Sequence, residues 1–359
     1  MSTRSIVPFG PQHPVLPEPI HLDLVLEDEK VVEAIPSIGF VHRGLEKLVE
    51  KKDFNDYVYV AERICGICSF MHGMGYCEAV ERIMEVEVPE RAVWLRSIWC
   101  ELSRIHSHLL WLGLLADALG FESLFMHTWR MREKILDMFE YSTGGRVIFS
   151  VNKIGGVRRD MDSAMLDDFL RILDGMSAEL KELTDTFLGD KAVAGRLSGV
   201  GFLTKEQAHD LGAVGPFMRS SGILRDTRTT GYGAYRHIDF EPIVSTAGDS
   251  YARTDVRIRE IFQSIGLIRQ FAAKIPEGDI NVTVKGFPQG EHFMRVEQPR
   301  GEAVYYVKAN GTKFLDRVRV RTPTFANLPA MLETLKGCQL ADVPVLILTI
   351  DPCISCTER

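Results

Sequence analysis

Two Cys-x-x-Cys pairs near opposite ends of the chain constrain its fold more than any other feature. The first pair is Cys65 and Cys68. The second is Cys353 and Cys356, followed only by Thr-Glu-Arg at the end of the 359 residues. Only a folded core can bring two such remote pairs together, so any site built from all four thiols must tie the end of the chain to its beginning.

The spacing of the cysteines leaves several kinds of site open. A structural zinc site also uses two Cys-x-x-Cys pairs, but these usually lie about 15–20 residues apart in a small ribbon. A thioredoxin-like redox pair belongs to a βαβ pattern, which neither pair follows. A site for a redox-active metal and a disulfide also fit the spacing. Spacing alone does not choose among them.

The composition is that of an ordinary globular protein. With 45% hydrophobic and 25% charged residues, the chain can bury a large core, and we expect a single domain over 1–359. The N-terminus lacks the apolar run of a signal peptide, and the net charge of -7 gives no basic surface for nucleic acid. Membrane contact is expected only through partners, because no stretch reaches the roughly 18–20 apolar residues of a bilayer span.

Both flanks of the chain are predicted to contain β structure. In the N-terminal segment 1–60, apolar and polar residues alternate over 20–34 around a charged turn, which predicts a hairpin. In the C-terminal segment 285–359, the turn signal Asn310-Gly311 joins 303–307 to 314–320 in a second hairpin. The apolar run 343–350 then leads to the second cysteine pair.

Helices are predicted for the middle of the chain. Apolar residues recur at three- and four-residue steps in the four segments 89–119, 125–141, 165–187 and 256–271. Between the third and fourth segments, 191–249 is predicted to form loops and short helices, with a capping box at Thr204 and Gln207. The expected fold is therefore α+β and predominantly α, with a central bundle of long helices over 89–275 and small flanking β hairpins or sheets.

The motifs around the cysteines resemble those of one known family, the large subunits of [NiFe] hydrogenases. The matching elements run in the family's order: Gly10-Pro-Gln-His-Pro14, His42-Arg-Gly-Leu-Glu46, Arg63-Ile-Cys-Gly-Ile-Cys68 with His72, Ser107-His-Leu-Leu-Trp111, Gln298-Pro-Arg-Gly301 and Asp351-Pro-Cys-Ile-Ser-Cys356 with Arg359. The first two elements and the terminal arginine resemble the energy-converting, membrane-associated branch (group 4). This branch is related to the quinone-site 49 kDa subunit of complex I, which has lost the four thiolates.

The resemblance implies a nickel–iron centre on the four cysteines. Splitting dihydrogen needs a soft, electron-rich metal with an open coordination position, and thiolates are soft ligands. In the family, Cys65 and Cys353 would bind nickel terminally, whereas Cys68 and Cys356 would bridge nickel to an iron that carries two cyanides and one carbon monoxide. His72 would hydrogen-bond a bridging sulfur.

Further residues around the centre carry expected roles by the same resemblance. Arg300 would lie over the open metal position beside one cyanide, and the hydroxyl of Thr324, after Pro323, would donate to the other. Glu18 would pass protons from a thiolate toward solvent. From the residue types alone, Arg300 could equally form a surface ion pair, Thr324 a turn, and Glu18 an exposed loop carboxylate.

The end of the chain departs from the family pattern. Glu46 matches a carboxylate that helps to hold a separate magnesium or iron ion, whose other side-chain ligand is usually a C-terminal histidine. Here that residue is Arg359, and a guanidinium has no lone pair for a cation. We therefore expect that Arg359 replaces the ion with a salt bridge toward Glu46 or its neighbourhood, which leaves a magnesium or iron ion at Glu46 as the alternative.

The remaining candidates carry less weight. Asp117 and His13 lie on the helix and loop that complex I uses near quinone. Three further cysteines, Cys77, Cys100 and Cys338, belong to no motif and are expected to pack as small hydrophobic residues.

The expected function is that of the catalytic subunit of an energy-converting [NiFe] hydrogenase that interconverts protons, electrons and dihydrogen, with ferredoxin as electron donor. No cysteine set remains for an iron-sulfur cluster, so the resemblance implies a cluster-bearing small subunit, ferredoxin-like subunits and integral membrane subunits that translocate ions. The expected location is the cytoplasmic face of the membrane. The alternative is a complex-I-like quinone or structural subunit whose thiols hold zinc or nothing.

Overall fold

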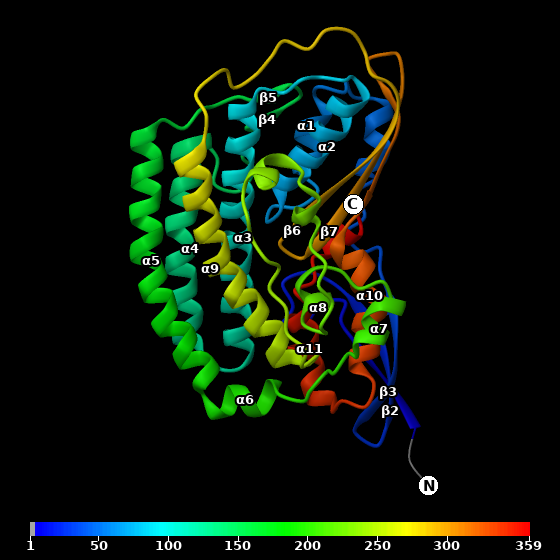
Figure 1. Cartoon of the computed structure of the whole chain (residues 1–359). Helices are drawn as coiled ribbons and strands as arrows, with labels where there is room; N and C mark the ends of the chain where they lie inside the picture. The colour runs from blue at the N-terminus through cyan, green and yellow to red at the C-terminus, as the bar shows by residue number, and fades with distance from the viewer. Residues whose placement is uncertain (1–3) are drawn as a thin grey trace.

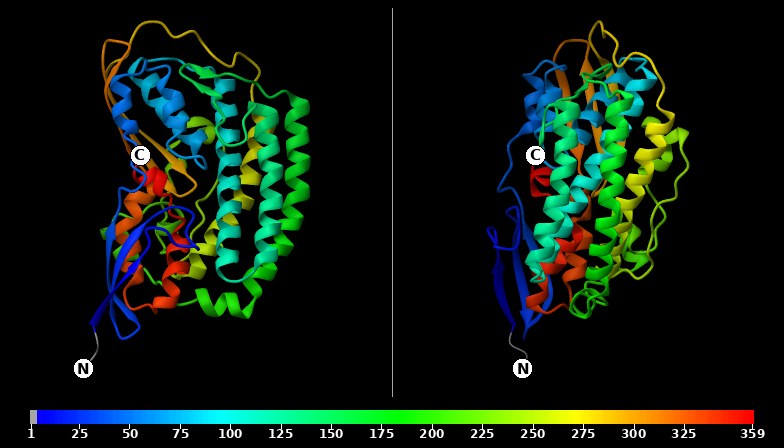
Figure 2. Two further views of the ribbon diagram at one scale, coloured as in Figure 1. Left: turned by 180° about the vertical axis from the view of Figure 1, so that it is seen from behind. Right: turned by 90° about the vertical axis from the view of Figure 1, so that its left-hand side faces the viewer.

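Four long helices form one side of the molecule in the computed structural model, which describes residues 4–359 (Figure 1). They are α3 (Glu90–Ala118), α4 (Glu122–Thr143), α5 (Ser163–Gly189) and α9 (Ser250–Lys274). Each corresponds to one of the four predicted helical segments, so the predicted bundle is confirmed. Helix α3 is one residue shorter than its segment at each end, and the other three helices extend a few residues beyond theirs. Figure 2 shows the four helices side by side, with the β sheets and short helices on the other side of α3.

The burial of each helix explains its place. Helix α3 is buried on almost all sides because it packs against α4 and α9 in the bundle and against the short helices on its other side, including α2 and α11. Helix α5 buries only one stripe and exposes the rest. Pro89 precedes the first turn of α3, where its missing N–H costs nothing, and Pro276 lies just beyond the end of α9.

The N-terminal sheet has three antiparallel strands in the order β1 (Arg4–Phe9), β2 (His21–Glu27) and β3 (Lys30–Ser37). The predicted hairpin over 20–34 is β2 and β3, and Asp28 makes the tight turn with a positive φ of 56°. Strand β1 pairs with β2 as the third strand of this sheet.

The C-terminal sheet also has three antiparallel strands, β6 (Gln289–Gln298), β7 (Gly301–Asn310) and β8 (Leu315–Arg321). The predicted hairpin around Asn310-Gly311 is β7 and β8, and β6 is the additional strand. The tight turn between β6 and β7 consists of Pro299 and Arg300, so the sheet presents Arg300 at one end. A two-stranded ribbon, β4 (Asn152–Lys153) and β5 (Gly156–Val157), completes the β structure that the described residues form.

Short helices connect these parts, and the capping box at Thr204 and Gln207 is confirmed at the start of α7. The short helices are α1 (Tyr57–Glu62), α2 (Ser69–Ile83), α6 (Lys191–Leu197), α7 (Lys205–Asp210), α8 (Gly215–Arg219), α10 (Pro323–Leu335), α11 (Val343–Ile350) and α12 (Ile354–Thr357). The 3-10 turns are η1 (Leu45–Glu50), η2 (Thr227–Thr230), η3 (Gly233–His237) and η4 (Leu340–Asp342).

The apolar run 343–350 is the helix α11, and the bundle holds its C-terminal end in place. Trp111 of α3 donates from Nε1 to the carbonyl of Leu348 over 2.7 Å, and Arg257 of α9 donates to the carbonyls of Thr349 and Ile350, both over 2.9 Å. These bonds satisfy carbonyl groups that the end of a helix leaves without partners. They fix the point from which the chain enters its last residues, beside β7 and α10 in Figure 1.

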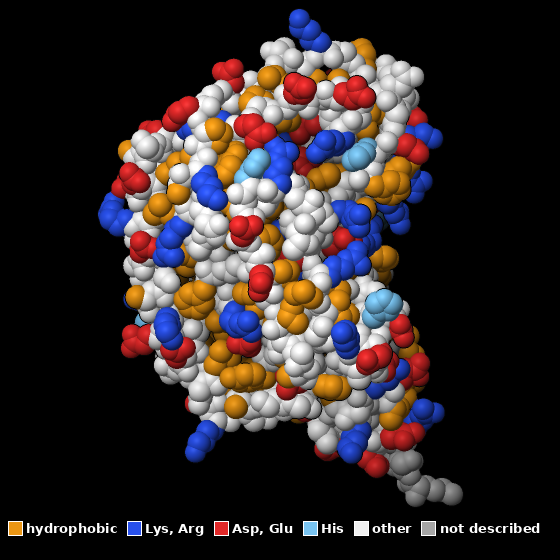
Figure 3. Space-filling model, in the orientation of Figure 1, with side chains coloured by type: hydrophobic (Ala, Val, Ile, Leu, Met, Phe, Trp, Pro, Cys, Tyr) orange, Lys and Arg blue, Asp and Glu red, His pale blue; other side chains and the backbone are white. Residues whose placement is uncertain are grey.

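The surface carries charges of both signs, with Lys and Arg side chains gathered near β7 and α10 in Figure 3. Several exposed arginines belong to the C-terminal sheet, among them Arg295 and Arg319. Within residues 4–359, no helix combines the length and apolar character needed to cross a bilayer.

Candidate metal centre

The four cysteines of the two pairs converge into one buried cluster. Their Sγ atoms all lie within 4.8 Å of one another, with 3.3 Å between Cys65 and Cys353 and 3.5 Å between Cys68 and Cys356. Within the described chain, this is the one group of three or more candidate ligands that could hold a metal ion. The fold thus joins the two ends of the chain at four sulfur atoms.

Local backbone structure directs each pair inward. Cys65 lies in the turn after α1, and Cys68 is the residue before α2. At the other end, Asp351 adopts a left-handed conformation with φ of 60°, which ends α11, and Pro352 then leads to Cys353 at the start of α12. Asp is one of the few residues that adopt this conformation readily.

One guanidinium links the two cysteine loops from outside. Arg43 donates to the carbonyls of Arg63 and Ile64 in the first loop, over 2.9 and 2.7 Å, and to that of Ser355 in the second, over 3.0 Å. The sequence motif around His42 therefore holds the loops at a fixed separation, a role that sequence reasoning did not assign.

The electrostatics of the sulfur cluster favour a negative charge on Cys65 and disfavour one on Cys356. Hydrogen bonds from Cys353, Cys356 and Cys68, aided by the positive Arg300, hold the pKa of Cys65 well below its ordinary value. The pKa of Cys356 is raised well above its ordinary value, because burial and the neighbouring sulfurs disfavour a second negative charge. A bound divalent cation would remove this conflict, because coordinating thiols lose their protons. The donor set therefore fits a soft metal.

Arg300 reaches the cluster from the turn between β6 and β7. Its guanidinium lies 2.7 Å from Oδ1 of Asp351 and donates to the hydroxyl of Ser107 over 3.1 Å. Burial disfavours its charge, but Asp351 and the neighbouring cysteine sulfurs raise the pKa of Arg300 well above its ordinary value. The surface ion pair that was the alternative for Arg300 is wrong, because the side chain is buried.

Arg300, Glu18, Cys65 and Cys353 line one cavity of about 320 Å³. Most of its other walls are apolar and come from α3, α4 and α11, including Trp111. The sulfur atoms that the resemblance assigns to nickel therefore face a largely apolar space, with a carboxylate and a guanidinium at its wall.

Glu18 binds the second cysteine loop directly. Its carboxylate accepts a hydrogen bond from the backbone N–H of Ser355 over 3.1 Å and further bonds from the N–H of Ile354 and the hydroxyl of Ser355. It thereby satisfies N–H groups at the start of α12. The exposed loop carboxylate considered as the alternative does not describe this residue.

Thr324 and His72 also contact the cysteines. Pro323 begins α10, and the hydroxyl of Thr324 accepts from the N–H of Cys353 over 3.0 Å, so this segment is a helix start rather than a simple turn. Nε2 of His72 lies 3.3 Å from Sγ of Cys356. Sequence reasoning missed Tyr305, whose phenol oxygen lies 2.7 Å from Nδ1 of His72, and Gln298, which donates to that phenol oxygen.

Arg359 forms an ion pair with Glu46. Nε of Arg359 lies 2.7 Å from Oε1 of Glu46, which also accepts from the N–H of Val320 over 2.9 Å. The guanidinium of Arg359 therefore lies beside the Glu46 carboxylate, at the position where the family pattern would place a cation.

The weaker candidates lie apart from the cluster. Nδ1 of His13 accepts from the N–H of Val15, and its ring stacks on Phe9. Asp117 is exposed near the end of α3, and neither it nor His13 lines the cavity. The other three cysteines, Cys77, Cys100 and Cys338, are buried without disulfides, and none belongs to the four-sulfur group.

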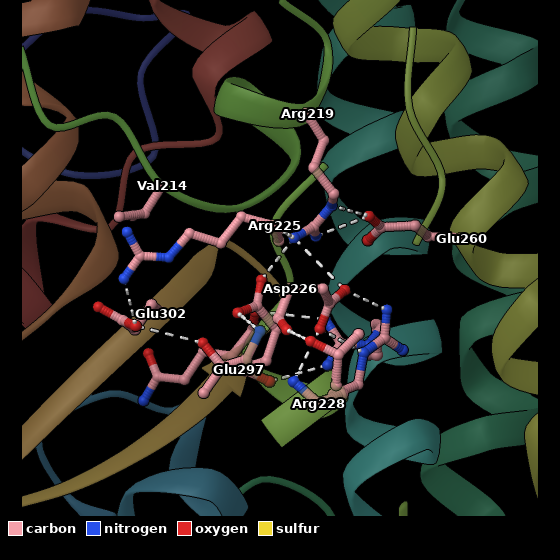
Figure 4. A network of polar contacts seen from close by, with 12 residues as sticks. Val214, Arg219, Arg225, Asp226, Arg228, Glu260, Glu297 and Glu302 are labelled. Atoms are coloured by element: carbon pink, nitrogen blue, oxygen red, sulfur yellow. Dashed lines mark hydrogen bonds and ion pairs between the residues drawn. The ribbon is translucent and has the colours of Figure 1, made fainter. Parts of the chain in front are cut away.

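Figure 4 shows a second polar region, in which charged side chains meet one another. Arg219 lies 2.8 Å from both Glu260 and Glu297 and 3.4 Å from Asp226. Arg228 pairs with Asp226 and Glu101. Glu101 also pairs with Arg104, whose guanidinium donates to the carbonyls of residues 297 and 298. We call these seven residues the ion network: Glu101, Arg104, Arg219, Asp226, Arg228, Glu260 and Glu297.

The ion network stabilises its own charges and anchors strand β6. Burial alone would raise the pKa of Glu260, but Arg219 holds it well below its ordinary value. The bonds from Arg104 hold the end of β6, immediately before the turn that carries Arg300. The network therefore fixes the backbone from which Arg300 reaches the cavity.

Two family models match different parts of the chain. The model of the nickel-dependent hydrogenases matches residues 43–121, which include the first cysteine pair. The model of the 49 kDa subunit of respiratory-chain NADH dehydrogenase matches residues 118–287 and 282–359, which include the second pair.

Individual relatives span the whole chain. The carbon monoxide-induced hydrogenase of Rhodospirillum rubrum is 38% identical over 362 residues, covering 100% of both chains. The membrane-bound hydrogenase subunit alpha of Pyrococcus furiosus is 39% identical and covers 98% of this chain and 87% of its own length. An NADH-quinone oxidoreductase subunit of Chloroherpeton thalassium is 34% identical, covering 97% and 86% respectively.

The fold is shared with a solved respiratory complex. A chain in the structure of the membrane-bound sulfane sulfur reductase, described as an archaeal respiratory membrane complex, superposes with a TM-score of 0.94 at 31% identity. The match covers 99% of this chain and 98% of the other.

Proposed function

Because the chain belongs to the family that unites the large subunits of group 4 [NiFe] hydrogenases with the 49 kDa subunits of complex I, we propose that it is the catalytic subunit of an energy-converting [NiFe] hydrogenase. In this role it interconverts protons and electrons with dihydrogen. The observation that carries the proposal is the convergence of four buried cysteine sulfurs within 4.8 Å. A subunit without a metal centre would have no need to bury four thiols together.

The cysteines would hold nickel and an iron with two cyanides and one carbon monoxide, with Cys65 and Cys353 on nickel alone and Cys68 and Cys356 shared. When bound, this centre supplies a soft metal with an open position at which dihydrogen is split or formed. Arg300 provides a buried positive charge at the cavity beside the cysteines. In the proposed role it faces a cyanide ligand, and Thr324 orients the loop of Cys353.

Glu18 is proposed as the group that moves protons. Its carboxylate lines the cavity together with Cys65 and Cys353 and is bonded to the second cysteine loop. A proton released at a cysteine sulfur is taken up on a carboxylate oxygen of Glu18 and then passed outward. The same bonds keep the carboxylate fixed, so that the acceptor oxygen stays beside the site.

Electrons must enter from a partner in this proposal. The described residues hold one four-cysteine group, and the other three cysteines are buried separately. We therefore propose a cluster-bearing small subunit, ferredoxin-like subunits that deliver electrons from ferredoxin, and integral membrane subunits that translocate ions. The relatives' membership in membrane-bound assemblies supports a peripheral position, which we propose to be the cytoplasmic face of the membrane.

Elemental analysis with infrared spectroscopy of the intact purified complex tests the proposal. About one nickel per chain, with iron and infrared bands of metal-bound carbonyl and cyanide, is the expected result. Hydrogen evolution with a chemically reduced dye as electron donor would test catalysis separately from the identity of the natural donor. Zinc as the sole metal at the four cysteines, or no metal, would overturn the proposal.

The second candidate function is that of a complex-I-like quinone subunit, and the similarity to NADH-quinone oxidoreductase subunits favours it. The quinone-side residues His13 and Asp117 do not line the cavity beside the cysteines. Quinone reduction by a complex that holds no nickel would establish this second function.

A further inference from the structure

Tyr305 lies behind the sulfur cluster in a chain of hydrogen bonds that ends at Cys356. The phenol oxygen of Tyr305 is 2.7 Å from Nδ1 of His72, and Nε2 of the same ring is 3.3 Å from Sγ of Cys356. Nε2 of Gln298 lies 3.1 Å from the phenol oxygen. All four side chains are buried, so water does not compete for these groups.

The direction of each bond follows from the chemistry of the last acceptor. If Cys356 is a metal-bound thiolate, as the proposed function requires, its sulfur has no proton and can only accept. Nε2 of His72 must then carry a hydrogen. The hydroxyl of Tyr305 has two polar neighbours, Nε2 of Gln298, which is itself a donor, and Nδ1 of His72, so Nδ1 is the acceptor and carries no hydrogen.

The second ring nitrogen therefore needs a donor, and Tyr305 supplies it. Burial raises the pKa of Tyr305 well above its ordinary value, so the phenol keeps its proton and donates to Nδ1. Gln298 in turn donates from Nε2 to the phenol oxygen. The 3.5 Å approach between Nε2 of Gln298 and Nε2 of His72 joins two donors in this arrangement and is no hydrogen bond.

The surroundings are shaped to accept the Tyr305 ring. Gly75 of α2 faces the ring, and a Cβ atom at this position would lie 2.4 Å from Cε2 of Tyr305. Gln298 is held at its backbone carbonyl by Arg104 of the ion network, over 3.2 Å. The ring of Tyr305 is therefore held by its close packing on Gly75, and the phenol oxygen is held by Gln298.

We propose that Tyr305 is a positioning residue of the metal centre, which holds His72 in the tautomer that donates from Nε2 to the sulfur of Cys356. This inference rests on the proposed function, because it takes Cys356 as a thiolate ligand. Donation of an N–H to the sulfur of Cys356 would withdraw electron density from a metal that this sulfur holds. Tyr305 therefore acts on the electronic state of the centre through His72 without touching it.

Nitrogen NMR of the full chain, labelled with 15N-histidine and loaded with zinc as a diamagnetic probe, tests the tautomer directly. His72→Gln assigns the signals. The parental chain is expected to show Nε2 protonated and Nδ1 unprotonated, and Tyr305→Phe is expected to lose this single state. Tyr306→Phe is the matched control, because the hydroxyl of Tyr306 bonds Glu291 on the exposed side of the sheet.

Gly75→Ala provides a second route that keeps the phenol and displaces its ring. If His72 keeps the Nε2–H tautomer completely in both Tyr305→Phe and Gly75→Ala, or if the parental chain shows Nδ1 protonated, the inference is overturned. In the intact complex, Tyr305→Phe is expected to shift the carbonyl infrared band to lower wavenumber and to lower turnover about 10- to 100-fold. An unshifted band would also count against the inference.

These outcomes are separable from those of the proposed function. Zinc in place of nickel in the natural complex would overturn the proposed function, yet the tautomer measurement on the zinc-loaded chain would still be readable. An unchanged tautomer in the variants would overturn only the role of Tyr305.

Discussion

The sulfur cluster and the ion network are both buried and both gather residues from distant parts of the chain, but they satisfy their polar groups differently. In the network, three guanidiniums face four carboxylates, and none of the seven side chains has a buried polar atom without a partner in the described structure. Around the cysteines, four sulfurs face one another, and Gln298, Asp351 and Glu358 each keep an unpaired buried oxygen.

Whether all buried polar groups have partners therefore distinguishes a region that stabilises the fold from a candidate functional site. Buried charges that are matched within the protein need nothing further, whereas buried groups that lack partners indicate a missing ligand or a functional constraint. The network is complete and stabilises the position of β6. For the sulfur cluster, the proposed function supplies the partner as a metal ion.

The largest expected effect comes from removing a ligand. Cys353→Ser should abolish both nickel binding and hydrogen turnover, because a serine oxygen is a hard, protonated donor. This loss is larger than the roughly 10- to 100-fold decrease in metal affinity or activity that follows substitution of residues around the ligands. Nickel content and hydrogen evolution measure this. Cys338→Ala, a buried cysteine outside the cluster, should retain both. Full nickel content in Cys353→Ser would show that the sulfur cluster is not the nickel site, and the contrast between the cluster and the ion network would then fail.

Glu18→Gln should keep the metals and lose proton transfer. The amide retains one oxygen for the N–H groups of α12 but cannot take up a proton, so turnover should fall about 10²- to 10⁴-fold. Glu18→Ala, which removes the acceptor altogether, should also lower metal content. Hydrogen evolution by Glu18→Gln at the parental rate would show that this residue only caps the loop.

Breaking the ion network should affect stability rather than metal chemistry. Arg219→Met leaves Glu260 and Glu297 buried without their shared partner and should lower the free energy of unfolding by about 3–5 kcal/mol. Urea denaturation of the chain measures the loss. Arg171→Met, which breaks an exposed pair with Asp168, should cost less than about 1 kcal/mol. Equal losses in the free energy of unfolding for Arg219→Met and Arg171→Met would mean that burial does not make an ion pair costlier to break.

Glu62 offers an unmatched carboxylate outside both regions. It is buried, it has no ion pair in the part of the chain described, and burial raises its pKa to about 7. A raised carboxyl pKa stabilises the fold below about pH 4.5, and this contribution is lost as the pH rises to about 7. Relative to the parental chain, Glu62→Gln should therefore gain about 3 kcal/mol of stability between those pH values.

Denaturation of both proteins at a series of pH values measures this difference. Glu260→Gln is the contrasting variant, because its carboxyl is ionised beside Arg219, and it should lose stability at neutral pH. A constant difference between Glu62→Gln and the parental chain would show that Glu62 is already ionised when buried.

The smallest effect is expected at the pair of Glu46 and Arg359. Arg359→Ala should cost about 1–2 kcal/mol, because the pair is only partly buried and the carboxylate keeps its bond from the N–H of Val320. Thermal unfolding measures it. Elemental analysis of the parental protein should find no magnesium at this place, and an ion bound at Glu46 would contradict the proposed replacement.

Much of the fold followed from periodicity. The four long helices, the hairpin over 20–34 and the hairpin around Asn310-Gly311 were predicted because each carries a complete local pattern or turn signal. Strand β6 was missed, because it lacks clean alternation of buried and exposed residues. The eight-residue run of α11, apolar except for Thr349, was left without an assignment, since so short a run fits a helix or a strand equally well.

The candidate site divides in a similar way. The thiols, Glu18, Arg300 and His72 were identified because their motifs have fixed spacing in the sequence. Tyr305, Arg43 and the ion network were not, because their roles depend on contacts between residues far apart in the chain. The glycines of α2 were the available signal for Tyr305, since Gly75 in the middle of a helix indicates the close approach of another group.

By itself, the sequence determined which atoms are available: four soft donors in two pairs, enough apolar periodicity for a bundle, and an arginine where a metal-binding histidine is expected. Only the tertiary structure decided that the sulfurs meet, which nitrogen of His72 faces Cys356 and which buried charges are matched. Local patterns report the φ and ψ preferences and burial of neighbouring residues, whereas the geometry of a site depends on distances between segments that only packing sets.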